Sequence, residues 1–241
     1  LHVGTFTQRG TLDAAIDRLD HLVELGIDAV ELLPLAEAMG ERGWGYDGVH
    51  LWAVHHAYGG PAALRRFVDA AHQRSIGVLL DVVYNHLGPE GAYLDRFGPY
   101  FSGRHHTPWG AAVNLDGPGS GEVRRFIVDN ARHWCVDHHV NGLRIDAVHA
   151  LVDDSPVHVV AQLTAAVHGI EAVDGRRRWV VIEDERPDLL PLLGRGAGWG
   201  VDARWGDDLH HALHAHLTGE RDGYYAPYGR LAQVAEVLER G

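Results

Sequence analysis

The chain has 241 residues, a formal net charge of −12 and 46% hydrophobic residues, an ordinary balance for a globular protein with a large core. The acidic charge argues against bulk attraction to nucleic acid or to an anionic membrane, so we expect neither as a partner. A single cysteine, Cys135, excludes an internal disulfide framework and a metal site built from several cysteines. A transmembrane helix is not expected, because no uninterrupted run of about 18 apolar residues is present.

The start of the chain indicates a piece of a longer protein. Leu1 is not a translation start, and the one methionine is Met39. No signal peptide is visible, and we expect a cytoplasmic location. The sequence carries no signal for a particular oligomeric state.

Short apolar runs alternate with amphipathic patterns of helical period along the whole chain. The predicted elements are, in chain order, a strand at 2–6, a helix that Thr11 caps and Gly26 ends, a strand at 29–33, a helix that opens at Pro61, a strand at 77–83, a helix at 121–138, a strand at 142–147, a helix at 157–167, strands at 179–182 and 201–204, and helices near 208–217 and 229–239.

Strands that alternate with helices predict parallel βαβ units and an α/β fold. Six strands are expected in all. The loop at residues 87–119 is rich in glycine and proline and too long for a plain connection. It suggests a functional excursion after the third strand.

Polar residues follow three of the predicted strands where each one ends. The segments are Asp81-Val-Val-Tyr-Asn85-His86, Arg144-Ile-Asp146-Ala-Val-His149 and Val181-Ile-Glu183-Asp184. In a parallel barrel the carboxyl ends of the strands converge on one mouth, where the chemistry takes place. Alternation along the strand puts Arg144 and Asp146 on one side, which lets Arg144 hold Asp146 ionised.

These residues have two other interpretations. A buried Arg144–Asp146 salt bridge with polar caps at the strand ends explains each segment alone, whereas three such segments on separate strands favour an active site. A metal site is the second, because the chain has 19 histidines. No His-Glu-x-x-His motif or cysteine–histidine spacing is present, so we expect no metal and no cofactor.

Taken together, the three segments resemble the first three signature regions of the α-amylase family of glycoside hydrolases. Further segments resemble one branch of that family, the maltooligosyltrehalose trehalohydrolases, over essentially the whole chain. They are Leu1-His-Val-Gly-Thr-Phe6, Trp44-Gly-Tyr46-Asp47-Gly48, Tyr58-Gly-Gly60, Asn85-His-Leu-Gly-Pro-Glu-Gly91, Gly98-Pro-Tyr-Phe101, Thr107-Pro-Trp-Gly110, Asn114-Leu-Asp-Gly-Pro-Gly119 and Asp207-Asp208-Leu-His210-His211-Ala-Leu-His214. The last run favours this branch over the glucan-branching enzymes.

The resemblance implies retaining hydrolysis. Asp146 would be the nucleophile that forms a covalent glycosyl-enzyme, and Glu183 would be the general acid and then the base. Arg144 would keep Asp146 ionised, while partial burial would raise the pKa of Glu183. Tyr46 resembles the aromatic platform beneath the cleaved sugar, and its alternative role is that of a core aromatic at the rim.

Eight further residues would contact or support the sugars of the substrate. Those around the cleaved sugar and the adjoining subsite are Asp81, Asn85, His86 and His149. Those expected to bind sugar hydroxyls are Asp207, Asp208, His210 and His211. For this second set a solvated helix N-terminus is the alternative, since Asp is favoured there anyway.

Three departures from the family pattern concern the catalytic groups. The family has a third catalytic carboxylate in an Asn-His-Asp motif on the seventh strand, whereas the dipeptide His-Asp does not occur here. Ile182 replaces the alanine usual before the acid. The acidic pair Asp184-Glu185 would raise the pKa of Glu183 further if it faced that carboxyl group.

The fold that the resemblance implies is a TIM (β/α)8 barrel, truncated here to about its first six βα units. Residues 1–241 would be a partial catalytic barrel. An N-terminal β-domain, strands seven and eight and a C-terminal domain would lie outside this chain. We expect the isolated chain to be inactive and poorly stable, because an open barrel exposes two strand edges and an apolar interior.

The full enzyme would cleave the α-1,4-glucosidic bond next to a terminal trehalosyl unit of maltooligosyltrehalose and release trehalose, a step of trehalose biosynthesis. A related enzyme that branches or debranches α-glucans is one alternative. A non-catalytic glucan-binding relic is another, although the intact Arg144, Asp146 and Glu183 argue against it.

Overall fold

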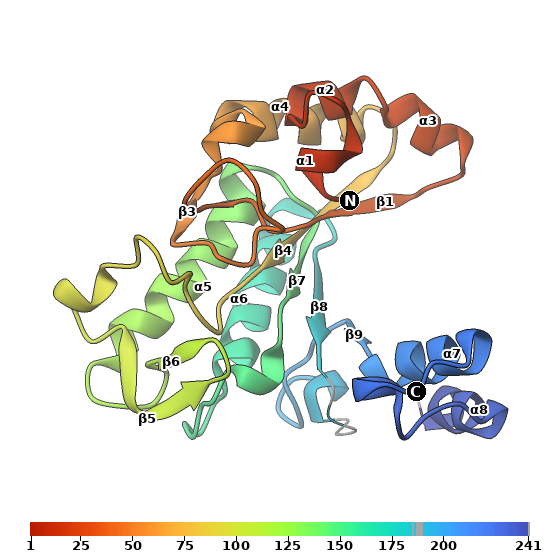
Figure 1. Cartoon of the computed structure of the whole chain (residues 1–241). Helices are drawn as coiled ribbons and strands as arrows, with labels where there is room; N and C mark the ends of the chain where they lie inside the picture. Colours follow the sequence, from red (N-terminus) through yellow and green to blue (C-terminus); the bar gives the residue numbers. More distant parts are fainter. Residues whose placement is uncertain (185, 187–189, 241) are drawn as a thin grey trace.

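The computed structural model describes residues 1–184, 186 and 190–240 (Figure 1). Among these residues the central sheet has five parallel strands, and their order in space follows their order in the chain. They are β1 (Ala29–Leu32), β4 (Gly77–Val82), β7 (Gly142–Ile145), β8 (Trp179–Glu183) and β9 (Ala203–Trp205). Consecutive strands of a (β/α) barrel have this order. Across the described residues the sheet stays open, with β1 and β9 at its edges.

Helices connect β1 to β4, β4 to β7 and β7 to β8, and they cover one face of the sheet. They are α4 (Gly60–His72), α5 (Ser120–Asp137) and α6 (Val159–Asp174), and β9 is followed by α7 (Asp207–Thr218) and α8 (Leu231–Arg240). In Figure 1, α5 and α6 lie side by side along β7 and β8. Alternate strand residues such as Val78, Leu80 and Ile145 are buried in the core. The positions between them, including Asp81 and Arg144, face the opposite side, which is the inner side of a barrel.

Shorter elements fill the connections. The hairpin of β2 (Ala36–Glu37) and β3 (His50–Val54) lies between β1 and α4, and that of β5 (Phe101–Thr107) and β6 (Gly110–Val113) lies in the excursion. The short helices α1 (Val3–Phe6), α2 (Leu12–Ile16) and α3 (Leu19–Glu24) precede β1. None of the helices within the described residues combines the length and the apolar character that crossing a lipid bilayer requires.

The strand predicted at residues 2–6 is wrong, because Val3–Phe6 forms a helical turn. Leu1 lies beside the end of β1, where its carbonyl oxygen accepts a hydrogen bond from Leu33 N at 3.0 Å. Beyond it the backbone coils, and Val3 packs into the core at 1% exposure. The apolar run therefore fills the core as a helix, and the sheet has five strands instead of the six expected.

The single helix predicted between Thr11 and Gly26 divides into α2 and α3. Thr11 caps α2 as expected, since its hydroxyl oxygen accepts from Ala14 N at 3.2 Å. A turn at residues 17–18 separates the two helices and leaves Leu19 fully buried. The other predicted helices and strands are confirmed; the largest difference is in α6, which continues to residue 174 instead of 167.

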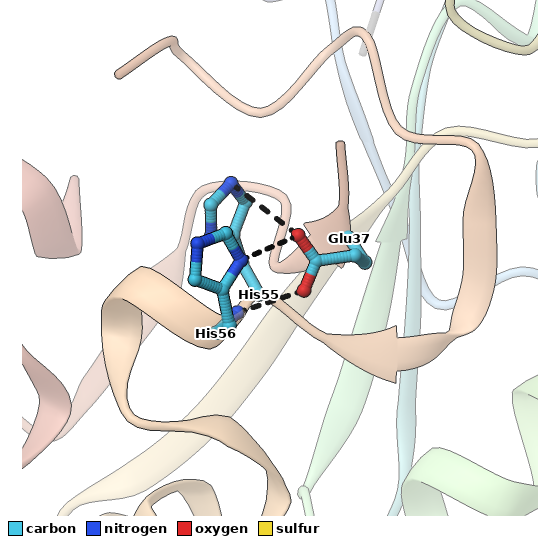
Figure 2. A group of neighbouring side chains, drawn as sticks. All are labelled: Glu37, His55 and His56. Carbon is cyan, nitrogen blue, oxygen red and sulfur yellow. Dashed lines mark hydrogen bonds and ion pairs between the residues drawn. The ribbon is translucent and has the colours of Figure 1, made fainter. Parts of the chain in front are cut away.

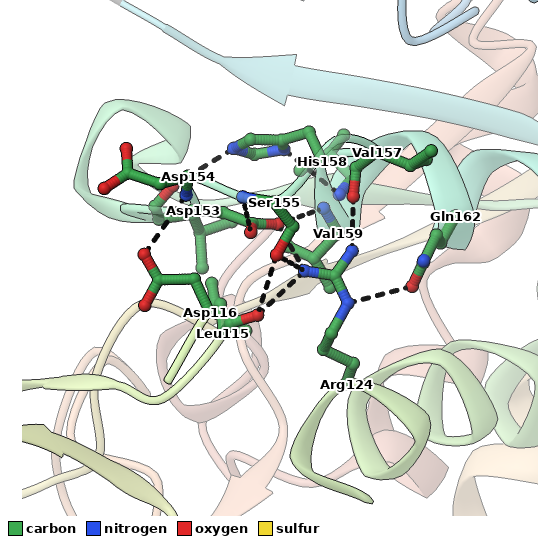
Figure 3. A network of polar contacts seen from close by, with 12 residues as sticks. Leu115, Asp116, Arg124, Asp153, Asp154, Ser155, Val157, His158, Val159 and Gln162 are labelled. Carbon is green, nitrogen blue, oxygen red and sulfur yellow. Dashed lines mark hydrogen bonds and ion pairs between the residues drawn. The ribbon is translucent and has the colours of Figure 1, made fainter. Parts of the chain in front are cut away.

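Arg124 joins the excursion to the segment that follows β7 (Figure 3). Its buried Nη1 donates to Leu115 O at 2.9 Å and to Asp153 Oδ2 at 2.6 Å. Nε donates to Gln162 Oε1 at 3.1 Å, and Nη2 donates to Val157 O. A buried guanidinium is tolerated when its donors are paired in this way. These contacts hold the end of the excursion against residues 153–157.

Replacement of Arg124 by methionine should lower the free energy of unfolding by about 3 kcal/mol, because buried Asp153 would lose its charged partner. Urea unfolding followed by circular dichroism measures the loss. Arg125→Met is the matched control. Arg125 pairs with Glu122 on the exposed surface of α5, so its removal should leave the free energy of unfolding nearly unchanged. Equal losses for the two variants would show that the Arg124 contacts do not stabilise the fold.

Candidate active site

Three neighbouring strands bring the predicted catalytic residues together. Asp81 and Arg144 are partners in the register of β4 and β7, and Asp146 and Glu183 follow the paired ends of β7 and β8. By strand alternation all four side chains lie on the inner face of the sheet. Parallel neighbours are about 4.8 Å apart, so the four groups can contact one another directly.

The guanidinium of Arg144 contacts three carboxyl groups. Nη1 donates to both oxygens of Asp81 at 2.8 Å and to Asp146 Oδ1 at 2.9 Å, and Nη2 lies 2.9 Å from Glu183 Oε1. The Arg144 side chain is 5% exposed, so water screens these pairs little. Burial opposes the charge of Arg144, but the surrounding carboxylates outweigh it and raise its pKa. One cation therefore fixes the positions of both predicted catalytic carboxyl groups.

Asn85 holds the second oxygen of Asp146. Its Nδ2 donates to Asp146 Oδ2 at 2.9 Å and to the backbone carbonyl of the same residue at 3.0 Å. Asn85 Oδ1 is hydrogen-bonded to His86 Nδ1, and His86 Nε2 lies 2.9 Å from Tyr46 O. With Arg144 on one oxygen and Asn85 on the other, the contacts of Asp146 suit the unprotonated carboxylate that a nucleophile requires.

Tyr46 reaches the site from the loop at residues 38–49, which we call the platform loop. Its hydroxyl donates to Asp81 Oδ2 at 2.9 Å. Gly45 makes this approach possible, because it has a φ of +100° and a Cβ there would lie 2.3 Å from Pro34 O. Burial and the charge of Asp81 raise the pKa of Tyr46, so its hydroxyl remains a hydrogen-bond donor.

Glu183 is tied to the backbone directly after Asp146. Its Oε2 accepts from Ala147 N at 2.9 Å, and Ala147 has a φ of 41°, in the left-handed region that alanine rarely adopts. Burial raises the pKa of Glu183, and the charges of Asp146 and Asp207 add to this effect against the opposing effect of Arg144. A carboxyl group with a raised pKa is suited to act as a general acid.

Asp81 and one further carboxyl group, that of Glu31, share the inner face with Arg144. Burial, with the charge of Asp146, raises the pKa of Asp81 to about 6. Burial, with the charges of Asp81 and Glu183, raises the pKa of Glu31 to about 7. Glu31 is not among the residues predicted from the sequence, although one acidic residue inside the apolar run at 29–33 is a visible signal. Because several acids face one cation, not all of them are ionised near neutral pH.

Other predicted residues lie on α7. Asp207 and Asp208 are in the first turn of the helix, where the charge of Asp207 acts on Glu183. His210 is exposed, and His211 packs against the rings of tyrosines in the segment 224–228. The binding of sugar hydroxyls by these residues remains a prediction.

His149 follows the catalytic candidate Asp146 by three residues, and Asp184 follows the candidate Glu183 directly. His149 lies in a 3-10 turn at residues 148–150 and is half-buried, with its Nδ1 enclosed by protein. Asp184 is 1% exposed, and Arg186 donates to its two oxygens at 2.8 and 2.7 Å. This pairing neutralises the charge of Asp184, which therefore adds little to the field at Glu183. Glu185 lies outside the described residues.

Two tryptophans that were not predicted as site residues also contact the site. The ring of Trp205, in β9, has the guanidinium carbon of Arg144 5.4 Å from its centre. Trp109, from the β5–β6 hairpin, stacks on His86 with ring centroids 5.3 Å apart. The excursion thus touches the site through Trp109, a contact that no local pattern reveals because it depends on the fold of the hairpin.

The chain is similar in sequence and in fold to proteins of known family. The family model described as "Alpha amylase, catalytic domain" matches residues 3–103. Malto-oligosyltrehalose trehalohydrolases of Arthrobacter ramosus and of Mycobacterium tuberculosis (strain CDC 1551 / Oshkosh) are 54% and 52% identical over 100% of this chain and 42% of their own length. A solved Salmonella typhimurium protein assigned to the α-amylases has a TM-score of 0.88 and 39% identity, over 99% of this chain and 41% of its own.

The chain is therefore similar to proteins of the α-amylase family over its whole length. It spans about 42% of the length of the curated relatives it matches. The parallel sheet with helices on its outer face fits the barrel type of that family, and the Arg144 cluster lies at the carboxyl ends of its strands.

Glu37, His55 and His56 lie close enough together to hold an ion (Figure 2). His55 Nδ1 accepts from Ala57 N at 3.1 Å, so its Nε2 carries the ring proton. The two imidazoles stack with centroids 4.8 Å apart and planes 20° from parallel, and His55 Nε2 lies 3.9 Å from the Glu37 oxygen that His56 Nδ1 contacts. His56 N and Nδ1 both lie 2.8 Å from the Glu37 carboxylate. We therefore interpret the group as a hydrogen-bonded clamp at the base of the platform loop.

A second group, His105, Asp116 and Asp154, lies where the excursion meets the segment after β7. Arg104 Nη2 is 2.8 Å from Asp116 Oδ2, so a protein cation already occupies that side of the carboxylate. The absence of a functional metal site remains a prediction.

Glu31→Gln should stabilise the chain at alkaline pH. Because the pKa of Glu31 is raised on folding, the folded chain binds its proton more tightly than the unfolded chain, and stability falls as pH rises from about 4.5 to about 7. Glutamine avoids this loss, so the variant should gain about 1 kcal/mol at pH 8 and almost nothing at pH 4. Urea unfolding at the two pH values measures the difference. The exposed Glu24→Gln serves as control, and a gain for Glu31→Gln that is independent of pH would refute the explanation.

Proposed function

We propose that residues 1–241 form part of the catalytic (β/α)8 barrel of a retaining glycoside hydrolase that acts on maltooligosyltrehalose. The enzyme cleaves the α-1,4-glucosidic bond next to the terminal trehalosyl unit and releases trehalose, as a step in trehalose biosynthesis. The observation that carries the reaction type is that one guanidinium, Arg144, contacts both Asp146 and Glu183. The names of the relatives support the choice of substrate.

In the first step Glu183 donates its proton to the glycosidic oxygen while Asp146 attacks the anomeric carbon. The bond from that carbon to the oxygen of the departing trehalose breaks, and an ester bond to Asp146 forms. Arg144 and Asn85 keep Asp146 in place for the attack through the contacts described above. Retention requires carboxyl groups about 5–5.5 Å apart, a separation that contact with a single guanidinium favours.

In the second step the same two groups exchange tasks. Once Asp146 is an ester its negative charge is gone, and with it one of the effects that raise the pKa of Glu183. Glu183, now a carboxylate, takes a proton from water, which attacks the anomeric carbon and breaks the ester. Two displacements on the same carbon leave the new reducing end in the α configuration, with Asp146 ionised and Glu183 protonated again.

The sugar that is cleaved lies on the ring of Tyr46 in this proposal. Asp81, Asn85 and His86 support it from β4, and His149 faces the adjoining subsite. Support comes from the hydrogen bond between Tyr46 and Asp81, which joins the platform loop to the carboxylate cluster. Asp207, Asp208, His210 and His211 bind hydroxyls of the same oligosaccharide.

The rest of the barrel belongs, in this proposal, to the remainder of the full-length protein. That remainder supplies the three other strands of the barrel, strands seven and eight among them, the third carboxylate in an Asn-His-Asp motif, an N-terminal β-domain and a C-terminal domain. The 42% share of the relatives' length that this chain spans, and the open edges of the sheet, support this division.

Asp146→Asn and Glu183→Gln in the full-length protein should each lower kcat for trehalose release by about 10³-fold or more, because each removes a group that reacts with the substrate. Chromatographic detection of trehalose from maltooligosyltrehalose measures the rate. The exposed Asp129→Asn and Glu24→Gln are matched controls and should keep the rate of the parent. Near-normal activity of either active-site variant would overturn the assigned roles.

The product also separates the proposal from its rivals. If the parent protein forms α-1,6 branches in amylose and releases no trehalose, it is a branching enzyme. If it binds glucans without any turnover, it is a non-catalytic relic. A glycosyl adduct mapped to the peptide that contains Asp146 would exclude the relic.

A further inference from the structure

A groove of about 590 Å³ opens beside the platform loop, apart from the Arg144 cluster. Its walls come from residues 2–10 at the start of the chain, from residues 41–44 of the platform loop and from residues 57–58 before α4. The platform loop follows the carboxyl end of β1, so the groove is on the same side of the sheet as the candidate active site.

An exposed tryptophan forms one side of the groove. Trp44 is 67% exposed, and its ring lies 5.2 Å from that of His2. His2 is fixed in turn, with Nδ1 3.0 Å from Thr5 Oγ1 and Nε2 2.9 Å from Gly43 O. A large aromatic ring left exposed on a fixed wall indicates a binding surface for a ligand with an apolar face.

The polar residues of the groove carry charges of both signs. Arg9 and Arg42 oppose Glu41, and Arg9 is already paired with Asp17 at 2.5 Å. Gln8 adds a donor and an acceptor in one side chain. A mixed set of this kind has no strong preference for an anion. It suits a neutral ligand whose many hydroxyl groups both donate and accept hydrogen bonds.

A residue of the groove, Trp44, is close in sequence to Tyr46, the predicted sugar platform. Trp44 and Tyr46 are two residues apart, so their Cα atoms are separated by at most about 7 Å. The turn at Gly45 directs Tyr46 inward to Asp81 while Trp44 remains exposed in the groove. The clamp of Glu37, His55 and His56 holds the base of the same loop (Figure 2). A glucan chain that rests on Tyr46 therefore has Trp44 within reach of a neighbouring unit.

We propose that the Trp44 groove is an extension subsite that binds an α-1,4-linked glucose unit away from the bond that is cleaved. The apolar face of the sugar stacks on the Trp44 ring, and its hydroxyls are bound by Gln8, Arg9 and Glu41. This inference rests on the proposed function for the identity of the ligand. It assigns to Trp44 a role in substrate length and not in the chemical step.

Trp44→Ala should weaken the binding of maltoheptaose about tenfold and leave the binding of maltotriose unchanged, because only the longer chain reaches the groove. Isothermal titration calorimetry on the full-length protein measures both affinities. All variants carry Glu183→Gln so that the ligand is not consumed. Trp44→Phe should restore most of the affinity. Trp179→Ala, a substitution of a 43% exposed tryptophan at the other end of β8, should have no effect on either ligand.

A second measurement observes residue 44 directly in the protein that retains its tryptophan. With 5-fluorotryptophan in place of tryptophan, the ¹⁹F signal of residue 44, assigned by its loss in Trp44→Phe, should shift on addition of maltoheptaose. The subsite would be overturned if the ¹⁹F signal did not change, or if Trp44→Ala and the parent bound maltoheptaose with equal affinity. It would also be overturned if another part of the full-length chain covered the groove. Neither measurement needs turnover. The failure of the subsite is therefore distinct from the failure of the proposed function, which the absence of trehalose release would show.

Discussion

A single buried cation, Arg144, determines the arrangement of the site. Asp81, Asp146 and Glu183 lie within 2.9 Å of its guanidinium, on the ends of three different strands. Without the cation, three carboxyl groups taken out of water would repel one another, and removing one partner of such a cluster commonly costs several kcal/mol. The order and register of β4, β7 and β8 are therefore part of the chemistry, since they alone bring these ends together.

The loops around this centre are held by polar contacts of their own. Arg124 ties the excursion to the segment after β7, and the Glu37 clamp holds the base of the platform loop. Trp109 reaches His86 from the β5–β6 hairpin. Binding residues are thus carried on irregular segments that the sheet and these anchors position, an arrangement common in proteins whose sites lie at the carboxyl ends of parallel strands.

The sequence predicted the parts of the site that depend on local periodicity. Arg144 and Asp146 share a face because side chains alternate along a strand, and the apolar runs before Asp81 and Glu183 mark buried strands. Trp109, Trp205 and Arg124 could not be predicted, because their contacts depend on how distant segments pack. The strand expected at residues 2–6 failed for a related reason. Its apolar pattern is satisfied equally well by a helical turn that buries Val3, and only the packing decides between the two.

The anomeric configuration of the product tests most directly whether Asp146 and Glu183, held by Arg144, act as nucleophile and acid/base. Proton NMR of the full-length protein with maltooligosyltrehalose, recorded before mutarotation, observes the new reducing end as it forms. The account predicts that the α-anomer appears first and that the β-anomer grows in later at the rate of mutarotation. Initial formation of the β-anomer would contradict it, because a single displacement by water leaves no role for Asp146 as a nucleophile.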